Sequence, residues 1–412
     1  MDANFKATHL LASRRPGYSL PQALYNDPAI FELEMAALFQ RDWLFAGHVC
    51  ELPDPGDFIT FRIGQAEAIV IRTASGEIRA FHNTCRHRGS RICQVAKGSA
   101  PRLVCPYHQW TYDFDGRLLF ARDMGPDFDP RQHALKPVPC ETLAGYVFVC
   151  FAEAAPDFGP LRAAIGPYLA PHGLADTKVA HQTTTIERGN WKLVWENNRE
   201  CYHCSGAHPE LCRTFPDAPT VNGVERADSD DRLAEHWHRC EAAGLPSRFL
   251  LAGEGRYRAM RVPLERDSES LTLSGKPASR RPLGGIAETG IGSMLLFHYP
   301  TTWNHLLRDH AVTFQVTPLG PQETRLTTKW LVHKDAVEGV DYDLAALTEV
   351  WAATNAEDAH LVEQNQLGVN SPAYEPGPYS PEHENGAAQF VDWYCATLAG
   401  RLAETAPAVA AE

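Results

Sequence analysis

Two short motifs in the first third of the chain constrain its fold most strongly. Cys85 and His87 form a Cys-x-His motif, and after seventeen intervening residues Cys105 and His108 form a Cys-x2-His motif. For both thiols and both imidazoles to reach one centre, two hairpin tips of a small β domain must lie side by side. Such a Cys2His2 set can form a closed tetrahedral zinc site, or it can bind a [2Fe–2S] cluster with histidines on one iron.

The residues that flank these motifs favour the iron–sulfur cluster. They closely resemble the Rieske motif at Arg88, Gly89, Tyr107, Trp110 and Tyr112. The resemblance implies that the two cysteines hold the inner iron and the two histidines hold the outer iron near the surface, where an electron can leave. Zinc is the alternative, but a zinc site would not explain why a second metal constellation follows.

That second constellation lies in the middle of the chain. His203 and His208 follow Glu200, which stands three residues before the first histidine. Five positions on a regular helix turn by about 500°, so the two imidazoles would point roughly 140° apart unless the chain bends between them. We expect Gly206 to supply that bend. Taken alone, this stretch could equally contain two histidines that make only local hydrogen bonds near a helix end and bind no metal.

A third ligand is expected from a long helix near the C-terminus. A 2-His-1-carboxylate triad binds non-haem Fe(II) and leaves positions open for dioxygen and substrate. Helical spacing places one stripe of residues on a single face: Leu347, Trp351, Asn355, Asp358 and Val362. Asp358 should therefore face inward and be paired or metal-bound, whereas Glu357 points about 100° away and should be solvated. Taken alone, Asp358 could also be a buried carboxylate capped by a neighbouring side chain.

The motifs taken together resemble one family along almost the whole chain. A Rieske pair, two histidines preceded by Glu200, and Asp358 150 residues after His208 resemble the α subunits of Rieske non-haem iron oxygenases. The stretches from Glu196 to Cys204 and from Asn370 to Tyr379 resemble the subgroup that removes methyl groups from betaines. The resemblance implies a Rieske [2Fe–2S] cluster and a mononuclear Fe(II) held by His203, His208 and Asp358.

The resemblance also implies a reaction. O2 and two electrons would hydroxylate an N-methyl group of a quaternary ammonium betaine, and the product would collapse to formaldehyde and the demethylated amine. Proline betaine (stachydrine), converted to N-methylproline, is the expected substrate, and glycine betaine or a carnitine- or choline-type compound is the alternative. An aromatic-ring dioxygenase is a lower alternative. A Rieske electron-transfer protein would leave the second constellation unexplained.

Electron delivery would involve other chains. The family implies a homotrimer in which the Rieske domain of one copy lies beside the catalytic domain of the next. Glu200, where the wider family usually has Asp, would then bridge His108 of the neighbouring copy and His203. No Gly-x-Gly-x-x-Gly fingerprint follows a strand, so we expect NAD(P)H and flavin on a separate flavin/iron–sulfur reductase.

Composition narrows the class of protein further. The chain has 412 residues, of which 44% are hydrophobic and 22% charged, which is typical of a globular protein. A net charge of −13 argues against nucleic acid as a partner. We find neither a signal-peptide pattern nor an apolar run long enough to span a membrane, so we expect a cytoplasmic location. The eleven cysteines suggest thiolate ligands and buried thiols instead of a disulfide framework.

Hydrophobic periodicity divides the chain into three parts and predicts an α+β fold. Residues 1–40 form a helical lead-in expected to pack on the catalytic domain, and residues 41–155 form a small antiparallel β Rieske domain. Residues 156–412 form the catalytic domain, with a larger antiparallel sheet covered by helices in a helix-grip-like arrangement. Its long helix should run from about Tyr342 to Gln366. The polar segment from Pro216 to Arg239 is expected to be a surface excursion.

One aromatic stretch is a candidate for the substrate pocket. The residues from Phe297 to His305 are expected to join two strands of the larger sheet. Tyr299 and Trp303 are candidates for a cage around a quaternary ammonium, which binds aromatic faces. Asn304 or His305 would bind the substrate carboxylate. Aromatic side chains in the core of a strand are the alternative interpretation.

Overall fold

The computed structural model describes residues 2–216, 231–265 and 267–405. It divides into two compact units. The larger unit comprises Met1–Phe39, Gly159–Gly173 and Thr177–Glu412, and the smaller unit comprises Gln40–Phe158 and Leu174–Asp176. The N-terminal segment thus belongs to the same unit as the second half of the chain.

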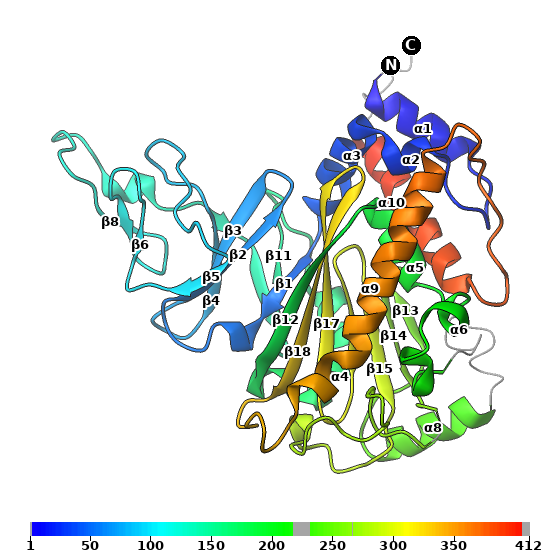
Figure 1. The fold of residues 1–412 in the computed structure, drawn as a ribbon. Helices are drawn as coiled ribbons and strands as arrows, with labels where there is room; N and C mark the ends of the chain where they lie inside the picture. The colour runs from blue at the N-terminus through cyan, green and yellow to red at the C-terminus, as the bar shows by residue number, and fades with distance from the viewer. Residues whose placement is uncertain (1, 217–230, 266, 406–412) are drawn as a thin grey trace. The chain divides into compact units, whose positions relative to one another are not determined.

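Three antiparallel sheets build the smaller unit (Figure 1). Their strands are β1 (Leu44–His48), β2 (Asp57–Ile63), β3 (Ala66–Arg72), β4 (Ile78–His82), β5 (Lys97–Ser99), β6 (Leu103–Val104), β7 (Thr111–Tyr112), β8 (Leu118–Phe120), β9 (Pro137–Val138), β10 (Cys140–Leu143) and β11 (Tyr146–Val149). The strand orders are β5-β2-β3-β4-β9, β6-β7-β8 and β1-β11-β10. This confirms the predicted small antiparallel β domain.

The core of the smaller unit reaches the first pair of motifs. Side chains alternate across a strand, so Ile69 and Ile71 of β3 point into the same core. That core also contains Phe81 and both motif cysteines, Cys85 and Cys105. Packing of the sheets therefore fixes the two thiols, although they lie in loops.

A seven-stranded antiparallel sheet forms the centre of the larger unit. In the order β12-β18-β17-β16-β15-β14-β13, its strands are Thr177–Glu187, Glu323–His333, Ala311–Gly320, Thr302–Leu306, Ser293–His298, Tyr257–Val262 and Leu250–Ala252. The predicted larger sheet is confirmed. The residues from Phe297 to His305 do join two strands of this sheet, β15 and β16, as expected, but Thr302–Leu306 was not predicted as a strand. Every residue of β16 is buried, so no alternation of polar and apolar residues marks it in the sequence.

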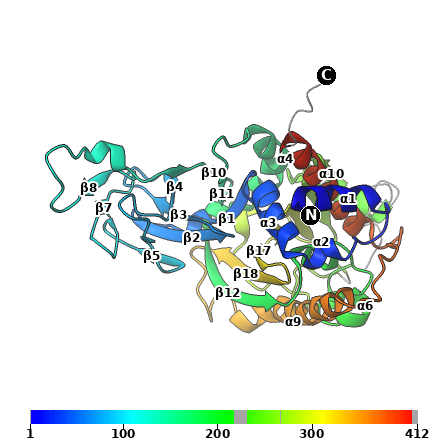
Figure 2. The same cartoon turned by 90° about the horizontal axis from the view of Figure 1, so that it is seen from above.

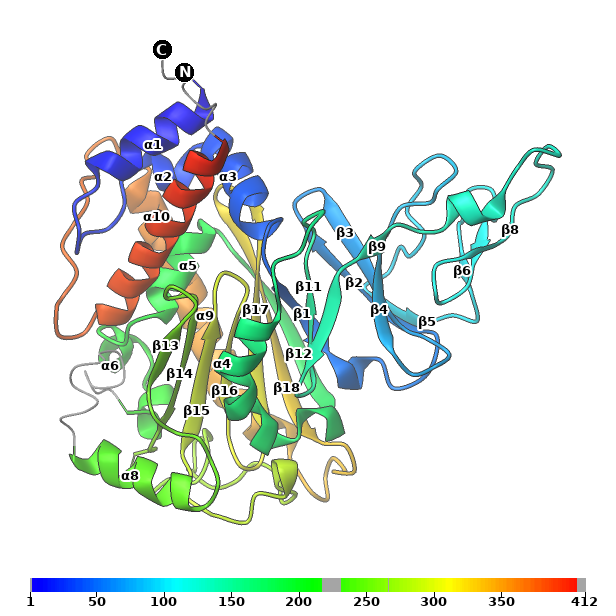
Figure 3. The same ribbon diagram turned by 180° about the vertical axis from the view of Figure 1, so that it is seen from behind.

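Helices cover both faces of this sheet. They are α1 (Ala3–Ser13), α2 (Ala23–Asn26), α3 (Pro28–Glu34), α4 (Gly159–Leu169), α5 (Trp191–Asn198), α6 (Cys204–Ala207), α8 (Asp231–Ala242), α9 (Leu344–Val369) and α10 (Asn385–Thr405). The long helix α9 runs along one face and α4 packs on the other (Figures 1 and 3). Seen from above, α9 lies beside β12 (Figure 2). Among the described residues, no helix is both long and apolar enough to cross a membrane.

The polar segment from Pro216 to Arg239 is only partly described. Residues 217–230 lie outside the described residues, so that part of the expectation stays a prediction. From Asp231 onward the chain forms α8, which buries Leu233 and Trp237, so this part is not a surface excursion. Its apolar residues recur at helical spacing among charged ones, which is typical of a helix with one buried face.

A buried carboxylate fixes the helix that leads to the second constellation. Glu34 of α3 accepts hydrogen bonds from Trp191 Nε1 at 2.9 Å, Lys192 Nζ at 2.7 Å and Tyr394 OH at 2.5 Å. The Lys192 and Glu34 side chains are fully buried, so each charge depends on the other. These contacts tie α5 to α3 and α10. The end of α5 is therefore a rigid support for the residues that follow it.

Candidate metal centres

The two motif loops of the smaller unit share one backbone design. In the first loop, the N–H of Cys85 donates to the carbonyl five residues later at 2.8 Å, and the Cys85 carbonyl accepts from the N–H of Gly89 at 3.0 Å. Cys105 and Gln109 repeat these bonds at 2.9 and 3.0 Å. Gly89 and Gln109 both have a positive φ, of 80° and 61°. The left-handed residue closes each loop at the same position, a conformation that glycine adopts easily.

The structure brings the side chains of the two loops together. His87 Nδ1 lies 3.1 Å from His108 Nδ1, and the Cys85 thiol interacts with Cys105. The cysteines are buried, with 3% and 1% of their surface exposed, whereas His87 is exposed and His108 partly so. Two inner thiols and two outer imidazoles are the arrangement that the Rieske resemblance implied.

Neighbouring aromatic side chains hold these ligands in place. Trp110 stacks on His87 with the ring centroids 4.9 Å apart, and Tyr112 OH lies 3.4 Å from Cys85 Sγ. A hydroxyl at that distance can donate to a sulfur that carries negative charge. The surroundings thus suit thiolate sulfur on the inside and imidazole nitrogen at the surface.

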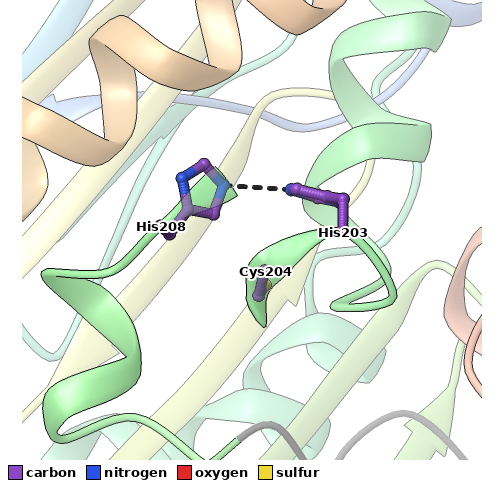
Figure 4. A group of neighbouring side chains, drawn as sticks. All are labelled: His203, Cys204 and His208. Atoms are coloured by element: carbon purple, nitrogen blue, oxygen red, sulfur yellow. Dashed lines mark hydrogen bonds between the residues drawn. The ribbon is translucent and has the colours of Figure 1, made fainter. Parts of the chain in front are cut away.

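In the larger unit, one short helical turn separates the two histidines of the second constellation. His203 precedes α6 and His208 ends it, with φ −123° and ψ 68° at His208. The imidazoles consequently face each other (Figure 4). The predicted bend at Gly206 was wrong: Gly206 lies inside α6, and the chain leaves the helix at His208. The His208 N–H still donates to the Cys204 carbonyl at 2.8 Å, but the φ and ψ of His208 are not helical, so the chain changes direction there.

Three ligand atoms converge at this point. His203 Nε2 lies 3.0 Å from His208 Nε2. Asp358 Oδ1 of α9 lies 3.0 Å from His208 Nε2 and 3.4 Å from His203 Nε2. The structure therefore brings together the three residues predicted as a facial triad, from segments far apart in the sequence.

Two further carboxylates determine which nitrogen of each imidazole carries the proton. Glu200 Oε1 lies 2.5 Å from His203 Nδ1, and Glu357 Oε2 lies 2.8 Å from His208 Nδ1. A carboxylate accepts a proton-bearing Nδ1–H, which leaves the Nε2 lone pair facing the centre. The expectation that Glu357 is solvated was wrong. His208 lies against the flank of α9, so a side chain 100° from the buried stripe reaches it.

A cation fits this arrangement. Burial opposes protonation of His203, but Asp358 and Glu200 raise its pKa to about 10, so the surroundings favour positive charge. Asp358 Oδ1 is buried and accepts no hydrogen bond within the described residues. Two imidazole nitrogens and one carboxylate oxygen form the donor set of non-haem Fe(II). Hydrogen-bonded carboxylates behind both imidazoles are typical of metal ligands.

A cysteine also lies near this centre. Cys204 Sγ lies within 4.8 Å of the nearest ligand atoms of both histidines (Figure 4). Its sulfur is bonded to Cys201, so it is not a free thiolate. The local donor set is therefore two histidines and one carboxylate. This single disulfide joins neighbouring turns and does not amount to a disulfide framework.

A small cavity of about 60 Å³ adjoins the centre. His203, His208 and Asp358 line one part of it, and aromatic and basic side chains line the rest: Phe215, Phe297, His305, Trp351, Arg199 and Arg258. Of the four predicted substrate residues, His305 lines this cavity. Burial, and then the charge of His310, lower the pKa of His305 to about 3, so its ring is neutral there.

The other three predicted substrate residues lie in the core. Trp303 is on the same strand as His305, but Trp195 of α5 covers it, with ring centroids 5.0 Å apart. Tyr299 is fully buried against the same tryptophan. Asn304 Nδ2 donates to the Leu296 carbonyl at 3.4 Å. The structure therefore places Tyr299, Trp303 and Asn304 away from the cavity, as the alternative of core aromatics would have it.

A second cavity, of about 430 Å³, borders Glu200 and His203 and contains a half-buried carboxylate that was not predicted from the sequence as a site residue. Tyr25 OH and Tyr379 OH each donate to Glu196 at 2.7 Å. Burial raises the pKa of Glu196 to about 7, although the two tyrosines oppose the rise. The special environment of Glu196 could not be predicted from the sequence, because it depends on two tyrosines that lie far away along the chain.

Replacing Glu196 with glutamine is expected to change stability in a pH-dependent way. The folded-state pKa of Glu196 is about 7 against 4.5 for the ordinary group, so the folded protein retains a proton through this window. The contribution of the Glu196 carboxyl group to the free energy of unfolding is therefore greatest below pH 4.5, and it is lost as the pH rises through 7. Glutamine mimics the neutral acid, so at pH 8 the variant should be more stable by about 1 to 3 kcal/mol.

Urea unfolding of both proteins at pH 5 and pH 8 measures this difference. The gain should nearly vanish at pH 5, where the wild-type carboxyl group is mostly protonated. Equal destabilisation of the variant at both pH values would show instead that Glu196 is needed as an anion.

Comparisons with known proteins agree with both centres. Residues 42–139 match the family model described as the Rieske [2Fe-2S] domain, and residues 174–400 match the ring hydroxylating alpha subunit (catalytic domain). The first match rules out the zinc alternative. The chain belongs to the α subunits of the Rieske non-haem iron oxygenases. It is thus the oxygenase subunit of an oxidoreductase that uses a [2Fe–2S] cluster and a mononuclear iron.

Similar proteins cover nearly the whole chain. The glycine betaine monooxygenase oxygenase subunit of Chromohalobacter salexigens is 47% identical, covering 97% of this chain and 90% of the relative. A Pseudomonas aeruginosa protein of the same name is 48% identical over 97% and 94%. Among solved structures, the quaternary ammonium Rieske monooxygenase CntA has a TM-score of 0.73 at 22% identity, covering 95% of this chain and 98% of CntA. This last likeness concerns the fold alone.

Proposed function

We propose that this chain removes one N-methyl group from glycine betaine, with O2 as oxidant and formaldehyde as a product. The observation that carries the proposal is the identity of 47% to 48%, over 97% of the chain, with proteins named glycine betaine monooxygenase oxygenase subunits. The sequence resemblance predicted proline betaine, but these relatives support glycine betaine better.

The roles of the residues follow from their positions. Cys85, Cys105, His87 and His108 would hold the [2Fe–2S] cluster, and His203, His208 and Asp358 would hold the mononuclear iron. When bound, the iron would supply two-electron activation of O2, so that one oxygen atom enters a methyl C–H bond and the other leaves as water. The hydroxymethyl ammonium then loses formaldehyde and a proton to give dimethylglycine. No protein nucleophile takes part in that step.

The cavity residues would bind and orient the methyl groups. Phe215, Phe297 and Trp351 line it, and the cation of a quaternary ammonium binds aromatic faces with about 0.5 to 2 kcal/mol per ring. His305 is neutral beside them and so adds no repelling charge. The aromatic side chains also exclude water from the reacting methyl group.

Glu200 would link the two metal centres across a subunit boundary. It holds His203 Nδ1 at 2.5 Å, and its side chain is only 13% exposed. We place His108 of a second copy of the chain on its other side, in a homotrimer, because His108 reaches the surface of the smaller unit. A separate NAD(P)H-dependent flavin/iron–sulfur reductase would supply the electrons.

A substrate panel tests the proposal. The purified protein, with a reductase, NADH and O2, is given glycine betaine, proline betaine, carnitine and naphthalene in parallel, and formaldehyde and ring diol are measured. Glycine betaine should yield formaldehyde fastest. Faster turnover of proline betaine would show that proline betaine is the preferred substrate, as the sequence resemblance predicted. A diol from naphthalene, with no formaldehyde from any betaine, would place the protein among the aromatic-ring dioxygenases.

A further inference from the structure

Two buried arginines line the cavity beside the metal triad. Arg199 and Arg258 are 1% and 2% exposed, and both line this cavity. Their guanidinium groups lie over one aromatic ring: Cζ of Arg199 is 4.2 Å and Cζ of Arg258 is 5.3 Å from the ring centroid of Phe297. Two guanidinium groups thus lie beside Phe297 in the wall of a small cavity of mixed polar and apolar lining.

Arg199 has hydrogen-bonding capacity left over. Its Nε donates to Tyr299 OH at 2.6 Å. Its Nη2 is buried, and within the described residues it has no hydrogen-bond partner. A buried charged donor without an acceptor is costly, and a neighbouring charge of the same sign adds to that cost. Burial, and then the charge of Arg199, lower the pKa of Arg258 well below its usual range.

The opposite sign of charge is found beside the metal triad in the lining of the same cavity. Asp358 and Glu200 both line it beside the two histidines. A cavity lined both by carboxylates and by guanidinium groups is poorly suited to a simple cation. It matches a zwitterion whose cationic and anionic groups are separated by a short link, because each end then meets its opposite charge.

We propose that Arg199, with Arg258 beside it, binds the carboxylate of the substrate. This inference rests on the proposed function and deepens it. The guanidinium of Arg199 supplies charged donors in a planar fork that matches a carboxylate. With the carboxylate held at the Phe297 end, the ammonium points toward Asp358 and presents an N-methyl group to the metal. Quaternary ammonium compounds that lack a carboxylate, such as choline, gain nothing from this end.

The test separates the two ends of the ligand. Dissociation constants are measured on the metal-loaded protein for glycine betaine, for choline, and for 3,3-dimethylbutanoate, which keeps the carboxylate and replaces the ammonium with a neutral group. Arg199→Gln should weaken both carboxylated ligands by about 10- to 100-fold and leave choline binding unchanged. Arg199→Lys keeps the charge and should recover part of the loss. The matched control is Arg213→Gln, at an exposed arginine in the segment that follows His208.

Arg258→Gln provides an independent measurement. Iron content and the visible spectrum of the cluster show that each variant is folded. If Arg199→Gln does not fold, a loss of carboxylate affinity in Arg258→Gln supports the proposal, and its absence overturns it. Equal losses for choline and glycine betaine, or unchanged affinity in both variants, also overturn it.

Failure of the proposed function would look different. In that case the wild-type protein would release no formaldehyde from glycine betaine, while the binding of 3,3-dimethylbutanoate would still depend on Arg199. A wild-type protein that demethylates glycine betaine but binds it independently of both arginines would contradict only the carboxylate site.

Discussion

Replacing Asp358 with alanine is expected to remove the mononuclear iron and leave the [2Fe–2S] cluster intact. Asp358 Oδ1 lies 3.0 Å from His208 Nε2 and 3.4 Å from His203 Nε2, so alanine leaves two imidazoles without an anionic ligand. Losing a hydrogen-bonded partner of a ligand weakens metal binding about 10- to 100-fold, so losing the ligand itself should cost at least about 100-fold. Iron and acid-labile sulfide analysis, with the visible spectrum of the cluster, measures both centres.

The neighbouring residue offers a matched control. Glu357→Gln keeps all three proposed ligands, and the amide oxygen can still accept from His208 Nδ1. This variant should retain most of its iron. A full complement of mononuclear iron in Asp358→Ala would contradict the assignment of the triad.

Changing Glu200 to glutamine is expected to keep both metal centres and to lower steady-state turnover by about 10- to 100-fold. Glu200 Oε1 lies 2.5 Å from His203 Nδ1, and the other oxygen accepts from the backbone N–H of Tyr202. Glutamine retains a polar contact but removes the negative charge that orients the imidazole. Under the proposed bridge, it also weakens the link to His108 of a second copy. Formaldehyde release and the rate of cluster reoxidation measure the effect.

Glu196→Gln is the control for this experiment, because Glu196 lies one turn earlier and contacts tyrosines instead of the histidines. It should retain most of the turnover. Wild-type rates in Glu200→Gln would rule out the bridging role.

Local motifs explain how much could be predicted from the sequence. Cys85 and His87 lie two residues apart, so any loop that places one near a metal places the other near it as well. The inward face of Asp358 follows from helical periodicity, and the structure does bring it to His203 and His208.

Contacts between distant segments account for what could not be predicted. Whether Trp303 faces substrate or core depends on Trp195, which lies more than a hundred residues earlier and covers it. Glu357 contacts His208 because the segment around α6 packs against α9 at that position. A helical wheel shows the faces of α9 alone and cannot predict that packing. The buried side chain of Arg199 likewise depends on Phe297 and Tyr299 of the sheet. A sequence pattern predicts which face of a single helix or strand is buried. The surroundings of Trp303, Glu357 and Arg199 depend instead on how several helices and strands pack together.

The most direct measurement is the single-turnover yield of formaldehyde from pre-reduced protein mixed with O2 and glycine betaine labelled with 13C in its methyl groups. In the pre-reduced protein the cluster and the ferrous iron would each supply one of the two electrons that the proposed reaction needs, so the assay contains no reductase. We expect labelled formaldehyde and dimethylglycine in equal amounts from the wild-type protein, and neither from Asp358→Ala with an equally reduced cluster. Consumption of O2 without labelled formaldehyde, or equal yields from both proteins, would contradict N-demethylation at the His203, His208 and Asp358 centre.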